Sequence, residues 1–183
     1  MKTALKWALY LSVLVSPPGW AQSGHPWVLV DTSTYTIEVL QGDNIIKEFH
    51  NISLGVGGVS AERVADDNKT PLGIFHVTSI NKKSRFHIFF GLDYPSLAQA
   101  KSAYYHNVID FGDYSAIQTA ALHGRQPPQD TALGGHIGIH GLGRGKLWIH
   151  NAYDWTKGCI ALTNGQVDEL SKWVDIGTLV VIR

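Results

Sequence analysis

The chain has 183 residues and carries 15 basic and 15 acidic side chains, so its formal net charge at neutral pH is zero. The sequence has no basic run or stripe, which excludes the charge pattern typical of nucleic-acid and polyanion binders. It has one cysteine, Cys159, so a disulfide within the chain is excluded as well. A lone thiol is a liability in an oxidising compartment unless it is buried or reactive, so Cys159 is the first candidate for function.

Residues 1–21 have the order of parts found in a secretory signal peptide. Lys2 and Lys6 form a short basic start, a mostly apolar run over residues 8–15 follows, and Gly19-Trp20-Ala21 supplies small residues at a cleavage site. The apolar run is shorter than the roughly 20 residues that a membrane helix needs. We therefore expect the protein to be exported to the periplasm or cell envelope.

Beyond this segment we expect a short linker over residues 22–26 and one folded domain over residues 27–183. No later run of the sequence is long and apolar enough for a membrane helix, so the mature chain is expected to have no transmembrane segment. Segments rich in β-branched and aromatic residues, bounded by turn residues, predict strands. These strands cover residues 27–30, 35–40, 45–52, 74–80, 135–141 and 178–182.

Helices are predicted in smaller number, so the expected fold is mostly β with a few helices (α+β). Residues 95–105 and 114–122 predict two helices, and Thr163-Asn164 resembles a helix cap in front of residues 167–174. The first two belong to a less regular stretch, residues 81–130, inserted between strands. Such a stretch commonly builds the walls of a binding site, and whether this one forms a mobile lid is left open.

The segment from Gly135 to Gly141 brings two histidines close together. In an alternating strand His136 and His140 share one face, and the glycine between them is expected to leave open space there. A thiol is a strong nucleophile only as its thiolate, which requires a nearby base or positive charge. His140, at the end of its strand and followed by a glycine, is therefore a candidate base for Cys159.

Two further residues near the cysteine bear on its chemistry. His150 is a second candidate for the base, but no glycine follows it. Gly158 immediately precedes Cys159, and a tight turn at a glycine could expose the sulfur. The same turn could direct backbone N–H groups at the oxyanion that develops during acyl transfer.

Two separated motifs resemble the active-site signature of the L,D-transpeptidase (YkuD) family. They are Ile139-His140-Gly141 and Thr156-Lys157-Gly158-Cys159-Ile160-Ala161-Leu162. A third segment, Lys69-Thr70-Pro71-Leu72-Gly73-Ile74-Phe75, resembles that family's entry to its catalytic sheet. The paired motifs at this spacing are specific, whereas either one alone would be weak. The sequence of residues 154–164, together with Leu92-Asp93-Tyr94-Pro95 upstream, is similar to sequences of the YafK-type periplasmic branch of the family.

The resemblance implies a mostly β fold and a cysteine enzyme, independent of metals and cofactors, that acts on peptidoglycan stem peptides in cell-wall biogenesis or remodelling. By position, Cys159 would attack an amide carbonyl and form a thioester, while His140 would accept and return the proton. The Gly141 carbonyl would orient His140, and the backbone of Gly158 and Cys159 would help to bind the oxyanion. The candidates for a supporting role are His136, Thr156 and His150.

The acceptor of the acyl group stays open at this point. An amine acceptor would make the enzyme a transpeptidase, whereas water would make it a carboxypeptidase or an amidase. Lys157 stands where many members of the family have a second histidine, and Ala161 stands where many have an arginine suited to a substrate carboxylate. These departures leave the substrate pose undefined, and no oligomeric state is predicted.

Two alternatives belong to other classes of function. His136, His140 and Cys159 are suitable zinc ligands, although Gly138 and its β-branched neighbours argue against the helix on which such a histidine spacing binds metal. The other alternative is a non-catalytic wall-binding module, whose platform of aromatic side chains would comprise Tyr104, Tyr105, Trp148, Tyr153 and Trp155. Aromatic residues at this density more often belong to a core.

Overall fold

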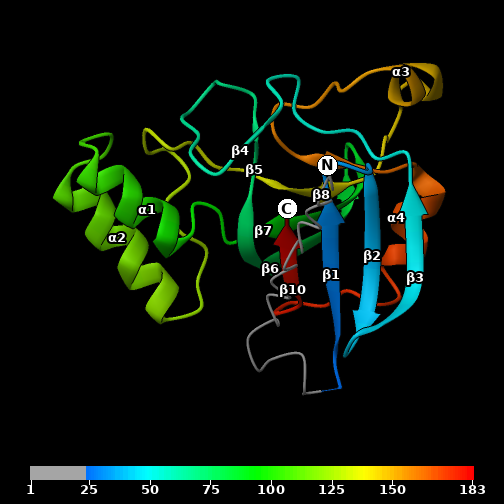
Figure 1. Cartoon of the computed structure of the whole chain (residues 1–183), viewed down its shortest axis with the longest axis horizontal. Coiled ribbons are helices and arrows are strands. Elements are labelled where there is room, and N and C mark those ends of the chain that lie inside the picture. Colours follow the sequence, from blue (N-terminus) through cyan, green and yellow to red (C-terminus); the bar gives the residue numbers. More distant parts are fainter. Residues whose placement is uncertain (1–23) are drawn as a thin grey trace, which may run out of the picture.

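The computed structural model describes residues 24–183, and Figure 1 shows its strands and helices. The expected signal peptide, residues 1–21, and the first residues of the expected linker lie outside the described part. The first strand begins at Pro26, so the last residue assigned to the linker already belongs to the fold. Within residues 24–183, no helix combines the length and apolar character needed to cross a membrane.

Eight strands form one mixed sheet. Their bounds are β1 Pro26–Asp31, β2 Thr36–Gln41, β3 Asn44–His50, β6 Gly73–Ser84, β7 His87–Leu92, β8 Gly138–His140, β9 Ile160–Ala161 and β10 Leu179–Ile182. The strands lie in the order β3-β2-β1-β10-β6-β7-β8-β9. Two neighbouring pairs are parallel, β1 with β10 and β8 with β9, and the others are antiparallel. A separate short parallel pair consists of β4 Val59–Ser60 and β5 Thr70–Pro71.

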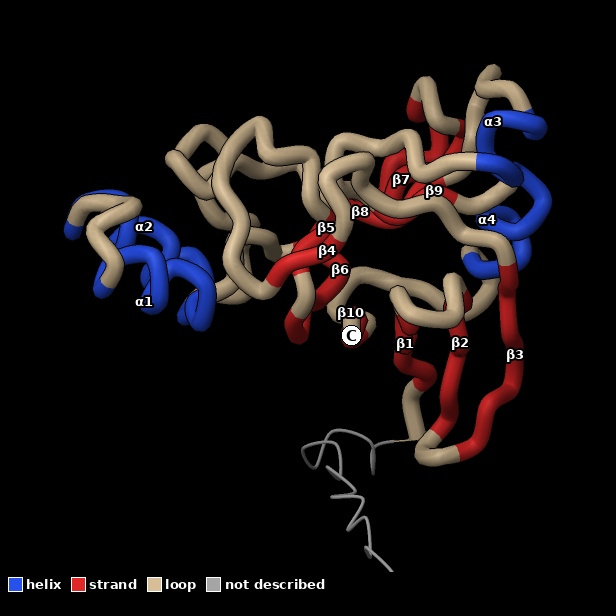
Figure 2. The backbone as a smooth tube through the Cα atoms, turned by 45° about the horizontal axis from the view of Figure 1, so that its top comes forward, coloured by secondary structure: helices blue, strands red, loops and turns tan. Residues whose placement is uncertain are grey.

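The main hydrophobic core is enclosed by the sheet and by helix α4 (Asn164–Leu170), which lies between the two edges of the sheet. Figure 2 shows α4 between the β3 edge and the β9 edge. Buried side chains from both edges and from the helix form one cluster, which includes Val39, Phe49, Phe90, Ile139, Ile160, Val167 and Leu170. Since β8 and β9 contribute to this cluster, the strands that carry the two sequence motifs are held in place by the core.

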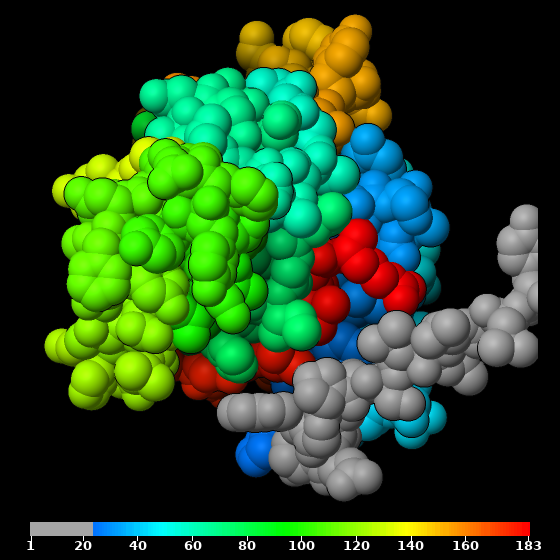
Figure 3. Space-filling model, turned by 60° about the vertical axis from the view of Figure 1, so that its left-hand side comes forward, coloured from blue at the N-terminus to red at the C-terminus, as the bar shows by residue number. Residues whose placement is uncertain are grey.

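Helices α1 (Leu97–Tyr105) and α2 (Phe111–Leu122) form a lobe beside the sheet, at the left of Figure 1. α1 begins at a capping box, in which the side chains of Ser96 and Gln99 each accept a hydrogen bond from the other's backbone N–H. The lobe has its own small core, made of Ala100, Ala103, Ile109, Ile117 and Leu133. In the space-filling view its green surface meets the teal surface of the segment that joins β4 to β5 (Figure 3).

The observed elements confirm the mostly β fold and correct several predicted boundaries. The stretch 81–130 is regular at its start, because β6 continues to Ser84 and pairs with β7, a strand that was not predicted. Helix α3 (Leu147–Ala152) was also not predicted. The helix expected over residues 167–174 begins earlier, directly after the Thr163 cap, and ends at Leu170.

The strand predicted over residues 135–141 is correct only for Gly138–His140. His136 has a φ of 58°, in the left-handed region, and its backbone N–H donates to the side-chain carbonyl of Gln129 at 2.6 Å. This hydrogen bond replaces pairing with a neighbouring strand, so the chain turns at His136 and becomes extended only afterwards. The prediction that His136 and His140 share one strand face is therefore wrong.

Candidate active site

The pairing of β8 with β9 brings His140 and Cys159 to the same place. His140 is the last residue of β8 and pairs with Ala161, and the Leu162 N–H donates to the His140 carbonyl at 2.8 Å. Cys159 immediately precedes β9. Both side chains line one pocket of about 620 Å³. Residues that are far apart in the sequence thus meet because two short parallel strands are fixed side by side.

The imidazole of His140 is buried, with 2% of the residue exposed, and its orientation is fixed on several sides. Nδ1 lies 2.7 Å from the carbonyl oxygen of Gly141. The Phe86 ring stacks on the imidazole at a centroid distance of 4.2 Å, and the Trp155 ring meets it edge-on at 5.8 Å. Because a carbonyl can only accept, Nδ1 carries the proton and Nε2 is left as the basic nitrogen.

Burial also determines the charge of His140. Loss of solvent lowers the pKa of His140 to about 4, and this outweighs the hydrogen bond to the Gly141 carbonyl, which favours the protonated form. The charges of Arg85 and His150 lower the pKa further. The imidazole is therefore neutral at neutral pH, which is the protonation state that a general base requires.

Cys159 is a free, partly buried cysteine whose Sγ lies 3.3 Å from the His136 carbonyl oxygen, to which the thiol donates. Loss of solvent around the side chain raises the pKa of Cys159 to about 11. A hydrogen bond from the Gly138 backbone and the charge of Arg63 oppose this rise. The resting pair of Cys159 and His140 is accordingly a neutral thiol and a neutral imidazole.

Gly158 forms the turn that presents Cys159. Its φ is 117°, and a Cβ at this position would lie 2.6 Å from the Lys69 carbonyl oxygen. Only glycine fits such a conformation next to another backbone segment. The Gly158 N–H donates to Thr156 Oγ1 at 3.1 Å, and Thr156 Oγ1 in turn donates to the Cys159 carbonyl at 2.6 Å. The buried Thr156 side chain therefore stabilises the turn from both sides of Gly158.

These hydrogen bonds bear on the predicted oxyanion site. The Gly158 N–H already has an acceptor, so in this structure it is not directed into the pocket. The participation of the Cys159 backbone N–H stays a prediction. Gly141 has a different role from that of an oxyanion donor, because it supplies the carbonyl that orients His140, as the family resemblance implies.

The space expected at Gly138 is occupied. A Cβ on Gly138 would lie 2.3 Å from the Phe90 carbonyl oxygen and 2.7 Å from Cζ of Phe89. The glycine thus allows β7 to approach β8 closely, and Phe89 fills the volume that a side chain would need. Phe89 also stacks on His140 at a centroid distance of 6.1 Å.

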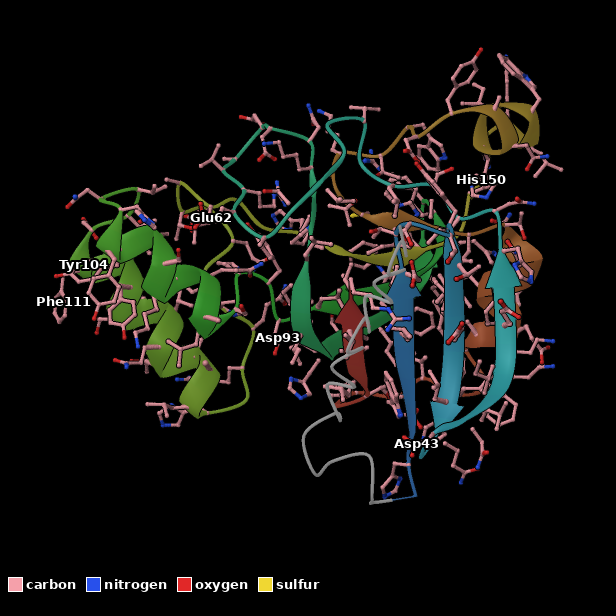
Figure 4. All side chains as sticks on the ribbon, viewed as in Figure 1. Asp43, Glu62, Asp93, Tyr104, Phe111 and His150 are labelled. Carbon is pink, nitrogen blue, oxygen red and sulfur yellow. The ribbon has the colours of Figure 1, made fainter. Side chains whose placement is uncertain are left out.

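The two other histidines take separate positions. His136 is exposed and lines the pocket, where its carbonyl rather than its imidazole contacts Cys159. His150 is a buried residue of α3 (Figure 4), and its Nδ1 lies 3.0 Å from Ser53 Oγ and 3.4 Å from Nε1 of Trp155. His150 does not line the Cys159 pocket, so it is poorly placed to be the alternative base.

Neither alternative function is supported by the geometry. Among residues 24–183, no group of three or more histidine, cysteine or acidic side chains could hold a metal ion, so His136, His140 and Cys159 do not form a zinc site. The aromatic candidates do not form one platform either. Tyr104 lies at the outer end of the helical lobe (Figure 4), whereas Trp155 packs against His140 in the pocket.

Several pocket residues had no signal in the sequence. Phe86 and Phe89 come from the β6–β7 hairpin, and Gln129 comes from the loop that follows the helical lobe. Arg63 comes from the segment between β4 and β5, which the sequence indicates only as a polar loop. The stretch 81–130 thus contributes pocket walls at both of its ends.

The pocket holds a thiol and a neutral imidazole whose orientation is fixed. This is the kind of site in which a cysteine can react as a nucleophile. The model of the YkuD family, the L,D-transpeptidase catalytic domain, matches residues 25–182. The chain therefore belongs to the YkuD family of L,D-transpeptidase catalytic domains. The narrower similarity to the YafK-type branch stays a prediction.

Solved structures have the same fold. Pgp2, a helical cell shape determining protein from Campylobacter jejuni, has 22% identity and a TM-score of 0.57, over 87% of this chain and 47% of that chain. Bd1075 from Bdellovibrio bacteriovorus has 18% identity and a TM-score of 0.54, over 87% of this chain and 48% of that chain. At these identities the likeness shows the fold alone, and the chain spans about half the length of both proteins. No curated protein matches the chain.

Proposed function

We propose that the protein is a cysteine acyltransferase that acts on peptidoglycan stem peptides through a thioester on Cys159. The observation that carries the proposal is the orientation of His140. Its Nδ1 is bound to the Gly141 carbonyl, and its ring lines the same pocket as the thiol. A backbone carbonyl thus has the orienting role that a carboxylate has in a Ser-His-Asp triad.

The first half-reaction forms the acyl-enzyme. Nε2 of His140 takes the thiol proton as Sγ of Cys159 attacks the carbonyl carbon of the substrate amide. The tetrahedral intermediate then collapses, the C–N bond breaks, and His140 returns the proton to the leaving amine. The products of this step are a free amine and a thioester on Cys159.

The second half-reaction transfers the acyl group. An acceptor amine gives its proton to His140 and attacks the thioester carbonyl, and the thiol leaves with that proton. A new amide is the product when the acceptor is an amine, and a carboxylic acid is the product when it is water. Transpeptidase, carboxypeptidase and amidase activities therefore share the first half-reaction and differ only in the acceptor or in the amide that is attacked.

The neutral resting pair determines when the proton moves. With the pKa of Cys159 at about 11 and the pKa of His140 at about 4, an ion pair is unfavourable before substrate binds. Proton transfer therefore accompanies the attack, and negative charge passes from sulfur to the substrate oxygen. The backbone N–H of Cys159 is our proposed donor to that oxygen.

The N-terminal sequence supports a proposal for the site of action. The signal-peptide pattern in residues 1–21 supports export, and we propose the periplasm or cell envelope as the location. Peptidoglycan is then within reach of the enzyme. The fold likeness to a helical cell shape determining protein makes wall remodelling that affects cell shape a suitable role to test.

The experiment that tests this function incubates the purified protein with defined muropeptides and identifies the products by mass. New crosslinks or exchange of the terminal amino acid mean transpeptidation, and shortened or released peptides mean hydrolysis. Either outcome supports acyl transfer if Cys159→Ala abolishes it. Turnover by Cys159→Ala at the wild-type rate refutes the mechanism.

A further inference from the structure

Arg63 is a buried residue that lines the candidate site, and it lies in the segment between β4 and β5. The residue is 6% exposed, and its side chain is 4% exposed. Nε lies 3.4 Å from Oδ1 of Asp67, and the guanidinium carbon lies 5.0 Å from the centre of the Tyr94 ring. These contacts hold the charge in one place, since both partners are themselves shielded from solvent.

Nη1 of the Arg63 guanidinium lies next to the turn at Gly158 that presents Cys159. Nη1 lies 3.4 Å from the position that a Cβ on Gly158 would occupy, so it is next to the residue that precedes Cys159. Nη1 is buried and has no hydrogen-bond acceptor in the described part of the protein. An unpaired buried N–H of a charged group is costly, which is a reason to ask what anion it would stabilise.

We propose that Arg63 is the fixed positive charge that stabilises the thiolate of Cys159 during catalysis. The inference deepens the proposed function, because a thiolate matters only if Cys159 reacts as a nucleophile. Arg63 acts through space on the sulfur and needs no contact with substrate, so it is a positioning residue rather than a catalytic one.

The other charged groups of the pocket are less suited to this task. The ionisable side chains that face Cys159 in the pocket are Arg63, Asp66, Arg85, His136, His140 and Lys157. Asp66, Arg85 and Lys157 are exposed, so solvent screens their charges. His140 is neutral in the resting enzyme, since burial lowers its pKa. Arg63 is thus the cation of this set that is both permanently charged and buried.

Asp67 moderates the charge of Arg63. Its carboxylate is ion-paired with Nε and also accepts the backbone N–H groups of Val64 and Lys69. Asp67 does not line the Cys159 pocket, although its neighbour Asp66 does. The Asp67 carboxylate therefore affects the thiol mainly by offsetting the charge of Arg63. Removal of the negative charge at Asp67 should therefore have the opposite effect to removal of the positive charge at Arg63.

The test measures alkylation of Cys159, the single cysteine of the chain, by iodoacetamide between pH 7 and pH 9 without substrate. Arg63→Gln should lower the thiolate fraction about tenfold, as expected for loss of a close opposite charge. The greater intrinsic nucleophilicity of a more basic thiolate offsets part of this, so the rate constant should fall about threefold. Arg63→Lys should recover most of the rate, whereas a purely structural defect would not respond to charge.

Two further variants complete the experiment. Asp67→Asn should raise the alkylation rate, and Arg125→Gln, the same change at an exposed arginine that does not line the Cys159 pocket, should leave it within about twofold of wild type. Thermal unfolding of each variant verifies that it is folded. If Arg63→Gln does not fold, the decision rests on Asp67→Asn, for which an unchanged or lower rate overturns the proposal.

The proposal is also overturned if folded Arg63→Gln reacts at the wild-type rate, or if Arg125→Gln slows alkylation as much. Because no substrate is present, the result is independent of the reaction that the enzyme catalyses. A charge effect on alkylation without turnover of any muropeptide would support Arg63 and refute the proposed function. Turnover of muropeptides without any effect of these charges on alkylation would support the proposed function and refute the role of Arg63.

Discussion

Nδ1 of His140 lies 2.7 Å from the carbonyl oxygen of Gly141, the residue that follows it in the chain. A histidine oriented by its own neighbour needs no acidic partner from elsewhere in the fold. The orientation depends instead on the backbone of Gly141, which is held closely, because a Cβ there would lie 2.8 Å from both Oδ1 of Asn164 and the Phe86 carbonyl. Base and orienting group are thus fixed by the end of a single strand.

His140→Gln should remove the base and leave the fold intact. We expect turnover of muropeptides to fall by a factor of about 10² to 10⁴, the usual contribution of a general base. The acid limb of the pH–rate profile, which reports ionisation of the base in the wild-type enzyme, should disappear. A variant with an unchanged pH–rate profile would remove His140 from this role.

The same histidine should make stability depend on pH. The pKa of His140 is about 4 in the folded protein and near the ordinary histidine value of 6.5 when the protein is unfolded. Above pH 6.5 both states are neutral, so the contribution is fully present there. As pH falls from 6.5 to 4 the unfolded state binds the proton first, and about 3 kcal/mol of stability should be lost.

Denaturant unfolding at pH 7 and pH 4 measures this effect, with His140→Gln as the reference. The loss in the wild-type protein should exceed the loss in the variant by the stated amount. Equal losses in the two proteins would show that His140 is not held neutral by burial.

Gly158→Ala should destabilise the turn that presents the cysteine. Its left-handed φ and the nearby Lys69 carbonyl leave no room for a Cβ. We expect the free energy of unfolding to fall by about 1 to 3 kcal/mol, together with activity. Gly165→Ala is the matched control, because a Cβ there meets no atom within 4 Å and the residue lies in helix α4. Thermal unfolding that ranks the two variants equally would contradict this account.

Thr156→Val should act on the same turn through hydrogen bonding. The change keeps the shape of the side chain but leaves the buried Gly158 N–H without its acceptor. We expect a loss of about 1 to 3 kcal/mol in unfolding free energy, and slower alkylation of a displaced thiol. Thr156→Ser, which retains Oγ, should stay close to wild type. If Val and Ser variants behave alike, the hydroxyl has no part in holding the turn.

Much of the fold could be predicted because local signals agree with the tertiary structure. The cap at Thr163 is formed as predicted, with Gln166 completing a capping box, and the strands near both ends of the chain lie close to their predicted positions. The family resemblance rested on short motifs whose spacing reflects the pairing of β8 with β9, a contact that no local pattern reveals.

The failures have physical causes as well. Alternation suggested that His136 continues the strand of His140, but the side chain of Gln129 captures the His136 N–H and turns the chain. The space expected at Gly138 depends on Phe89, which arrives from β7. Arg63 was unrecognised because its burial depends on Tyr94, a distant residue in the sequence. Each of these features is determined by contacts with side chains outside the local segment, which local propensity does not encode.

The central claim is that Cys159 carries the acyl group, and intact-protein mass spectrometry tests it most directly. The protein is mixed with a defined muropeptide donor, quenched in acid at short times and weighed. We predict a transient mass increase equal to the donor less its leaving amine, located on Cys159 by peptide mapping and absent from Cys159→Ala. Turnover of the donor by the wild-type protein without such an adduct, or with one at another residue, would contradict the claim.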